Sequence, residues 1–319
     1  MYRSVSVIFA GSLAIGIPNA HAYLPTPGYL ATGTLFTAES FAFGPGGQVA
    51  VGSDNFLGGA SISVYASLAD VGGVPTRTFT DPSWKFFGGI DFADATTVVF
   101  GENGSTAAVD AVYRGSILSG DVLTLSNVPN VGDVDVEGSS VYVAAQNGPG
   151  ANDVVRLPLA GGASTLLVEN FGTGYGGGVL VAGGKIYATE TNDPFFEGNA
   201  GNVHVFDLAG AFEMLILLTR GGGSGAVGLS AGFDGDIFVA TGNSISRIDI
   251  NTSSVTPFGQ FTGPFAFPTT IDFSGNRLFV NGIYTETGGT FAVSVPEPAG
   301  MVAIVVGSLA LLRRRGGVR

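Results

Sequence analysis

Residues 271–280 read Ile-Asp-Phe-Ser-Gly-Asn-Arg-Leu-Phe-Val, two short runs of β-forming side chains around a polar turn. Aromatic and β-branched residues favour strands, and the Ser-Gly-Asn between them is typical of a tight turn. The pattern recurs five times upstream, with first runs near residues 41, 90, 134, 179 and 229. The chain therefore contains a repeated hairpin.

The spacing of these hairpins predicts the fold. Their second strands begin at residues 49, 98, 141, 186, 237 and 278, so successive copies lie 41 to 51 residues apart. This range suits four-stranded propeller blades. Third strands are visible in the copies, for example at Ser61–Tyr65 and Asp153–Leu157, and fourth strands at Met214–Leu218 and Ser254–Phe258. No stretch of ten residues in the body has a helical period.

We therefore predict an all-β, six-bladed β-propeller over residues 23–295. The last copy stops after Thr290–Val295, so Tyr29–Phe36 is expected to supply its outer strand and close the ring. The repeated turn-and-strand pattern loosely resembles NHL and lactonase-like propeller repeats. A β-sandwich or a β-solenoid is the alternative fold.

The N-terminus reads as a secretory signal peptide. Arg3 precedes an apolar or small stretch from Val5 to Ile17, and Ala20-His21-Ala22 is a small-x-small cleavage site. Such a segment is removed on export and excluded from the fold. The mature chain is expected to begin at Tyr23, after a signal peptide of residues 1–22.

The C-terminus has three parts, Pro296-Glu297-Pro298, an uncharged span over 299–312, and Arg313-Arg314-Arg315. The 14 residues of the span would form a helix of about 21 Å. This is short against a hydrocarbon core of about 30 Å. The arginines place the C-terminus on the cytoplasmic side, so the body is expected outside the inner membrane.

This tail resembles the PEP-CTERM sorting signal of exported bacterial proteins, over residues 296–319. The resemblance implies recognition and cleavage by a membrane-embedded exosortase, after signal peptidase has acted at the other end. It also implies an exopolysaccharide or biofilm setting in a Gram-negative bacterium. The expected course is an inner-membrane-anchored precursor, then a periplasmic, cell-surface or extracellular-matrix protein. An ordinary single-pass anchor is the alternative.

Composition excludes several functions for the body. Without Arg3, Glu297 and the four arginines after Leu312, it holds 24 acidic and 8 basic residues. Nucleic acid is then a poor partner, because it requires a basic surface. The chain has no cysteine, so a thiol nucleophile is impossible. Glycines number 52 in 319 residues, about twice the usual ~7%, and they lie where turns are needed.

Catalytic motifs are scarce. His204 is the only histidine after Tyr23 and lies in the alternating run Val203–Phe206, where a strand residue is expected rather than a base or a metal ligand. A zinc site or a Ser–His triad therefore lacks its partners. The glycine clusters have no following lysine and helix, so phosphate binding is not predicted.

Three acids form the one constellation with chemical meaning. Asp91, Asp135 and Asp272 occupy the same place in three copies, in the first strand, which lines the channel of a propeller. Oxygen ligands of this kind suit Ca²⁺ or Mg²⁺ rather than softer metals. The favoured alternative is that each carboxylate accepts a backbone N–H between blades, because like charges converging without a cation are costly. The equivalent residues Ala42, Leu180 and Ser230 leave the ring incomplete.

Longer loops follow the second strands and are expected on one face of the propeller. They carry the aromatic residues Phe56, Phe195, Phe196 and Tyr284, of which we predict the last three as ligand contacts, because exposed rings beside Asn and Asp suit carbohydrate stacking. The stretch from Glu190 to Asn199 is rich in oxygen ligands but lacks EF-hand spacing, so a solvated loop is expected.

The sequence thus predicts an exported, exosortase-processed surface or matrix protein without a cofactor, whose non-catalytic propeller binds carbohydrate or another surface component. A Ca²⁺-dependent lactonase- or esterase-like hydrolase that uses the channel acids is the first alternative. A purely structural matrix protein is the second.

Overall fold

A computed structural model describes residues 40–294 except 56–57, 105–109, 149, 192–200, 219–225, 233–234, 242–243, 261–264, 275–276 and 285–288. Within this part the chain is almost entirely β-strand, and the one helical element is the 3-10 turn η2 (Leu68–Asp70). No described helix is long and apolar enough to cross a membrane. The predicted signal peptide, the sorting signal with its 299–312 span, and the strand Tyr29–Phe36 all lie outside the described residues.

The strands form six antiparallel sheets, each made of consecutive strands of the chain. The first two sheets contain β1 (Phe41–Phe43), β2 (Val49–Ser53), β3 (Ser61–Tyr65) and β4 (Arg77–Thr80), then β5 (Phe87–Asp94), β6 (Thr97–Glu102), β7 (Ala111–Ser116) and β8 (Val122–Asn127). The third and fourth contain β9 (Val131–Glu137), β10 (Ser140–Gln146), β11 (Asn152–Pro158) and β12 (Thr165–Phe171), then β13 (Tyr175–Ala182), β14 (Lys185–Thr191), β15 (Asn202–Asp207) and β16 (Phe212–Leu217). The fifth and sixth contain β17 (Ala226–Ala231), β18 (Ile237–Thr241), β19 (Ser244–Ile248) and β20 (Val255–Gln260), then β21 (Phe265–Ser274), β22 (Arg277–Tyr284) and β23 (Gly289–Ser294).

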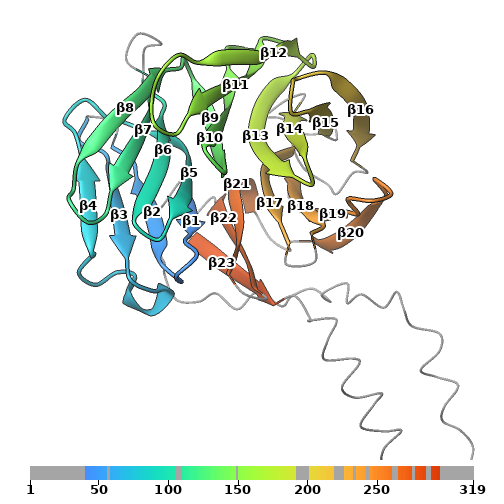
Figure 1. The fold of residues 1–319 in the computed structure, drawn as a ribbon. Coiled ribbons are helices and arrows are strands. Elements are labelled where there is room, and N and C mark those ends of the chain that lie inside the picture. Colours follow the sequence, from blue (N-terminus) through green and yellow to red (C-terminus); the bar gives the residue numbers. More distant parts are fainter. Residues whose placement is uncertain are drawn as a thin grey trace, which may run out of the picture.

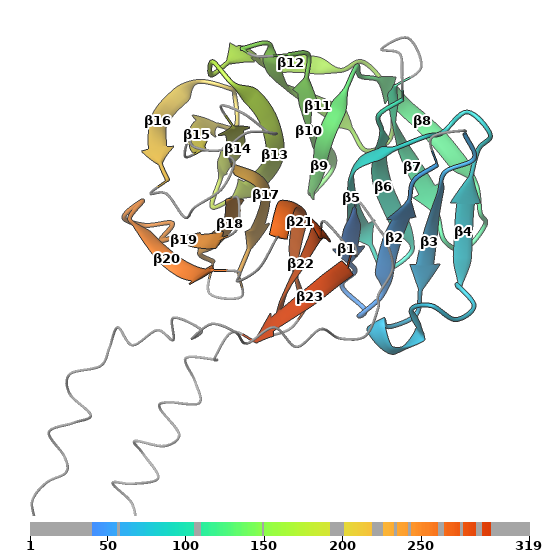
Figure 2. The ribbon, with the colours of Figure 1, turned by 180° about the vertical axis from the view of Figure 1, so that it is seen from behind.

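These sheets are arranged around a central axis as in a propeller (Figures 1 and 2). The first strand of each sheet lies innermost and contacts the first strands of the sheets before and after it, including β21 against β1. The predicted all-β propeller is thus confirmed. The number of complete blades differs from the prediction, because five sheets have four strands and the sixth has three. The strand expected to complete the sixth falls outside the described residues.

The turn between β13 and β14 illustrates why glycine is frequent. It consists of Gly183 and Gly184, whose φ angles are 57° and 77°. A two-residue hairpin turn of this kind requires positive φ at both positions, which side chains other than glycine adopt at a cost. The twist of this turn matches that of the strands, so the hairpin register is fixed locally.

The core is divided among the seams between neighbouring sheets. Second strands are buried on both faces, and in β10 Val141 and Val143 pack toward the second sheet while Tyr142 and Ala144 pack toward the fourth. Double burial explains why these strands are almost continuously apolar. In the seam between the sixth and first sheets, the buried apolar residues that the structure describes include Phe41 and Phe279, with Val49 and Val51 close by and Phe43 and Leu68 partly buried beside them.

Candidate functional site: the acidic central channel

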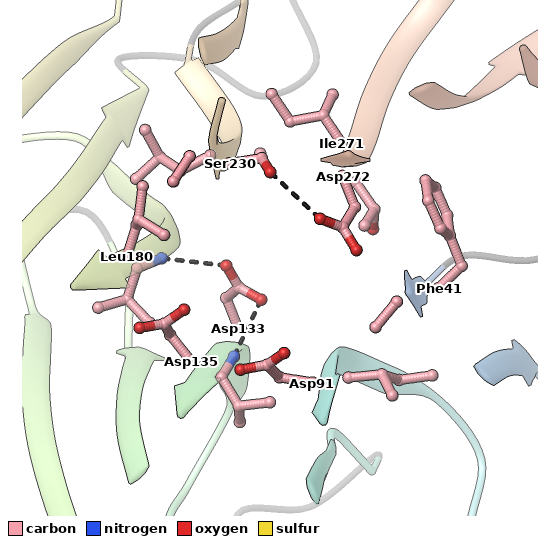
Figure 3. A pocket seen from close by; sticks show the side chains of 16 residues that line it. Phe41, Asp91, Asp133, Asp135, Leu180, Ser230, Ile271 and Asp272 are labelled. Atoms are coloured by element: carbon pink, nitrogen blue, oxygen red, sulfur yellow. Dashed lines mark hydrogen bonds between the residues drawn. The ribbon is translucent and has the colours of Figure 1, made fainter. Parts of the chain in front are cut away.

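The first strands surround a cavity of about 190 Å³ at the centre of the ring. Four carboxylates line it, from Asp91 on β5, Asp133 and Asp135 on β9, and Asp272 on β21. Figure 3 shows the four side chains around one common space. The structure therefore brings together the three acids predicted from the sequence and adds Asp133 as a fourth.

Each carboxylate is hydrogen-bonded to backbone N–H groups of an adjoining sheet. Asp91 accepts from Val136 of β9 at 2.7 Å. Asp133 and Asp135 accept from Val179 and Val181 of β13 at 3.0 and 2.9 Å. These three bonds join the second sheet to the third, and the third to the fourth.

Asp272 closes the ring. Its Oδ2 accepts from the backbone N–H of Phe43 on β1 at 2.8 Å, and its Oδ1 accepts from the Ser230 hydroxyl of β17 at 3.2 Å. It therefore joins the sixth sheet to both of its neighbours. Asp91, Asp133 and Asp272 also accept the N–H of the next residue in their own strand, in each case through Oδ1. In Asp272 this oxygen is the one that also accepts from Ser230.

This geometry matches the interblade hydrogen bonds favoured from the sequence. Strand pairing places Asp91, Asp135 and Asp272 opposite Val99, Tyr142 and Phe279. Ala42, Leu180 and Ser230 lie opposite the corresponding residues Ala50, Tyr187 and Phe238. The ring of equivalent positions thus has carboxylates at three places, a hydroxyl at one and alkyl groups at two. The signal for Asp133 was its alternation with Asp135, two residues apart on one strand face.

Burial shifts the acid–base equilibria of the four groups. Loss of solvation raises the pKa of Asp133 to about 8 and of Asp135 to about 7, although backbone N–H donors oppose the rise. For Asp272, burial raises the pKa to about 6, against the N–H groups of Phe43 and Phe273. Burial and then the charge of Asp135 raise the pKa of Asp91 well above its usual range. Near neutral pH the channel therefore holds protonated and ionised carboxyl groups together.

The arrangement of these acids bears on cation binding. Among the described residues, no group of three or more His, Asp or Glu side chains is arranged to hold a metal ion. Both oxygens of Asp91, Asp133 and Asp272 accept hydrogen bonds from protein donors. The predicted Ca²⁺ ligands therefore lie together, and protein donors bind both oxygens of Asp91 and Asp272 and Oδ2 of Asp135.

A second buried polar cluster surrounds Glu190 near the end of β14. Its Oε2 accepts from His204 Nε2 on β15 at 2.7 Å, and its Oε1 accepts from the N–H of Gly174 at 2.6 Å. The side chains are almost fully buried. Burial alone would raise the pKa of Glu190, but bonds from His204 and from the N–H groups of Thr173 and Gly174 lower it to about 2.

Glu190 corrects one expectation from the sequence. The sequence predicts Glu190 at the start of a solvated loop, whereas it lies within β14 and fixes the connection between β12 and β13. His204 is a strand residue as predicted, and its partner is this carboxylate. The loop composition after residue 190 concealed the strand, because Glu and Thr are common in both settings.

The predicted ligand loops are only partly described. Phe56, Phe195 and Phe196 lie outside the described residues, and Tyr284 is the last residue of β22. The same holds for Ala20, Ala22, Pro296, Glu297, Pro298 and Arg313 to Arg315. The assignments to ligand binding, processing and sorting therefore stay predictions.

Comparison with known proteins agrees with the fold and leaves the family open. No family model matches the chain, and no curated protein matches it. A chain in a crystal structure of a nidogen/laminin complex is similar with a TM-score of 0.58 and 12% identity, covering 78% of this chain and 90% of that one. A chain of the Kuenenia stuttgartiensis hydrazine synthase has the same TM-score and identity, covering 82% of this chain and 84% of that one. At this identity the likeness establishes a propeller-like fold alone.

Proposed function

We propose that this chain is an exported, exosortase-processed surface or matrix protein whose propeller is a non-catalytic scaffold that binds carbohydrate or another surface component. The observation that carries the proposal is the use of the channel carboxylates. Asp91, Asp133, Asp135 and Asp272 hold neighbouring sheets together through backbone N–H groups. These hydrogen bonds give the carboxylates a structural role between sheets, which supports a scaffold over a set of acids reserved for a substrate or a metal ion.

We also propose that the three-stranded sheet is a sixth blade, completed by Tyr29–Phe36 pairing with β23. The closed circuit of first strands supports this, since β21 contacts both β17 and β1. An outer strand without a partner would leave N–H and C=O groups open to other chains. Pairing of the two ends of the body removes that liability.

The terminal segments support export. A small-x-small site at Ala20 and Ala22 and the tail from Pro296 to Arg315 fit signal peptidase and exosortase as processing partners. The similar chains belong in one case to a nidogen/laminin complex and in the other to a hydrazine synthase. The fold therefore serves in both complexes and enzymes, and the channel geometry favours the binding role.

The decisive experiment tests the channel against the surface. Purified protein is assayed for hydrolysis of lactones and esters with and without Ca²⁺ at about 1 mM, which is about 100-fold above the ~10 μM Kd of a weak Ca²⁺ sensor site. The same protein is assayed for binding to exopolysaccharide. We expect no Ca²⁺-dependent turnover and measurable binding. Ca²⁺-dependent hydrolysis abolished by Asp272→Asn would replace this proposal with the hydrolase.

A further inference from the structure

A depression lies on the tight-turn face of the propeller, directly beyond the acidic channel. It is lined by the ends of β1, β5 and β21 and the turn after β1, and has a volume of about 520 Å³. The same three strands line the channel with Ala42, Asp91 and Asp272, each one residue before the lining residues Phe43, Phe92 and Phe273. The depression therefore continues the channel to the surface.

Aromatic rings from three different sheets form its walls. The ring centroid of Phe43 lies 4.6 Å from that of Phe279, and the centroid of Phe273 lies 4.9 Å from that of Phe238. Phe92 is buried in the seam between the first and second sheets. Packing of this kind holds the rings in place, so the walls exist before any ligand arrives.

The rim is fixed as well. Gln48 in the β1–β2 turn donates from Nε2 to the carbonyl of Ala95 in the β5–β6 turn at 3.0 Å. Its Oε1 accepts from the N–H of Gly46 at 2.8 Å. The two neighbouring turns are thereby tied together, which preserves the shape of the mouth.

The electrostatic setting selects the ligand. None of the eight lining residues is charged, and the acids of the channel lie one residue further in along the strands. Phenylalanine rings attract cations through the negative potential of their faces. Asp272, whose pKa of about 6 leaves its carboxylate largely ionised near neutral pH, lies behind these low-dielectric walls and places a negative potential at the opening. The body as a whole has 16 more acidic than basic residues, which disfavours anions.

We propose that the depression at Phe43, Phe92 and Phe273 binds an organic ammonium group, such as that of an amino sugar. The ammonium lies against the rings, toward the channel, and the rest of the ligand occupies the open side. The volume falls within the range of about 300–1,000 Å³ usual for small-molecule sites. The inference deepens the proposed carbohydrate-binding role and rests on it only for the source of the ammonium group.

The test compares two oligosaccharides of equal length, one of glucosamine and one of N-acetylglucosamine, by calorimetric titration of the full-length chain in a nonionic detergent. We expect the glucosamine oligomer to bind at least tenfold more tightly, because acetylation removes the charge. Tetramethylammonium chloride should compete with it, whereas an equal concentration of sodium chloride should compete less. Equal affinity for the two oligosaccharides would overturn the proposal and leave a neutral carbohydrate site intact.

Variants locate the site. Phe43→Leu and Phe273→Leu keep apolar volume but remove the aromatic face, and each should weaken glucosamine-oligomer binding at least fivefold. Phe212→Leu is the matched control, since Phe212 lies on the outer strand β16 with 59% of its surface exposed. Unchanged affinity in both channel-mouth variants, with thermal unfolding like that of the wild type, would also overturn the proposal. The tetramethylammonium competition needs no variant, so a folding defect does not obstruct the test.

Discussion

At the scale of single residues, the channel carboxylates accept N–H groups that the sheets cannot pair. A first strand has a hydrogen-bonded neighbour on one side only, so its other edge presents donors to the next sheet. Asp91, Asp133, Asp135 and Asp272 supply acceptors at that edge. Two seams have an alkyl side chain at the equivalent position: Ala42 between the first and second sheets, and Leu180 between the fourth and fifth. Large apolar clusters stabilise both of these seams.

The raised pKa values of these acids predict an unusual pH dependence. Their folded-state pKa values of about 6, 7 and 8 exceed the unfolded value of about 3.9. The folded state thus binds protons more tightly, so the free energy of unfolding should rise as pH falls from about 8 toward about 4. Urea denaturation at pH 8 and pH 5 should differ by at least about 1 kcal/mol, the free energy of one pKa unit.

Below that window the trend reverses. The pKa of Glu190 is lowered to about 2, so its contribution to the free energy of unfolding is present above the unfolded pKa and is lost as pH falls through the folded pKa.

The Asp133→Asn variant tests the trend above pH 5. Because an amide does not titrate, this variant should show a flatter dependence of the free energy of unfolding on pH between pH 7 and pH 9. Stability that is constant or increasing from pH 5 to pH 8 in the wild type would contradict the assignment.

At this scale, the sequence predicts features that depend on neighbouring residues and misses those that depend on distant ones. The positions of Asp91, Asp135 and Asp272 were predictable, because period-two alternation and a tight turn define which residue is central in a first strand. The choice between cation ligand and interblade acceptor was not, because their donors lie some 45 residues away, or 229 in the case of Phe43 and Asp272. The pairing of Glu190 with His204, 14 residues apart, was hidden for another reason, because the composition after residue 190 predicts a loop where β14 continues.

At the scale of the elements, β5 and β9 approach each other closely at two glycines of β5. A Cβ added to Gly88 would meet the backbone carbonyl of Val131, and one added to Gly89 would meet the Asp133 carboxylate and the backbone at Val134. Gly88→Ala must therefore push the two sheets apart. We expect a loss of about 2 kcal/mol or more, in the range of overpacked cores.

Thermal unfolding of the Gly88→Ala protein measures this effect. Gly47→Ala is the control for removing a glycine, because a Cβ at Gly47 meets nothing within 4 Å, although its φ of 83° carries a strain of its own. A Tm for Gly88→Ala no lower than that of Gly47→Ala would show that the seam between β5 and β9 yields easily.

The outer strand of the sixth sheet gives the second prediction at this scale. Deleting Tyr29–Phe36 should destabilise the domain by several kcal/mol, about the total margin of many domains, because β23 would lose its outer partner. Deleting Leu24–Gly28 is the control, since it shortens the same segment outside the predicted strand. Equal thermal unfolding of the two deletions would reject the pairing.

At the scale of the whole molecule, the terminal signals predict what leaves the cell. Protein isolated from the native host should lack residues 1–22 and the apolar tail beyond Pro296–Pro298. The measurement is the intact mass of the secreted form. A mass that includes Leu312 and the arginines after it would contradict sorting and favour an ordinary membrane anchor.

The long-loop face carries the remaining whole-molecule prediction. Phe195→Ala with Phe196→Ala should weaken matrix binding without unfolding, because ring stacking on sugars depends on exposed apolar area. The Asp91→Asn, Asp135→Asn and Asp272→Asn variants should lower stability and change binding through the long loops little, whereas they should weaken ammonium binding at the channel mouth. Binding assays with both sets, run beside thermal unfolding, separate the two effects. Loss of binding through the long loops in the folded asparagine variants alone would contradict this division.

The bond between Phe43 and Asp272 spans 229 positions of the chain. Bringing two points so far apart together costs about 5 kcal/mol of chain entropy by the logarithmic loop law, and contacts of the seam such as that of Phe41 with Phe279 must offset this cost. Contacts between residues far apart in the sequence form late in folding and lower the folding rate. The five complete sheets can therefore assemble as an open arc while the chain is still emerging, and the ring closes only after β21 has been made. A chain cut short before residue 272 should then collapse into structured but unclosed material, with its first and last strands exposed to other molecules.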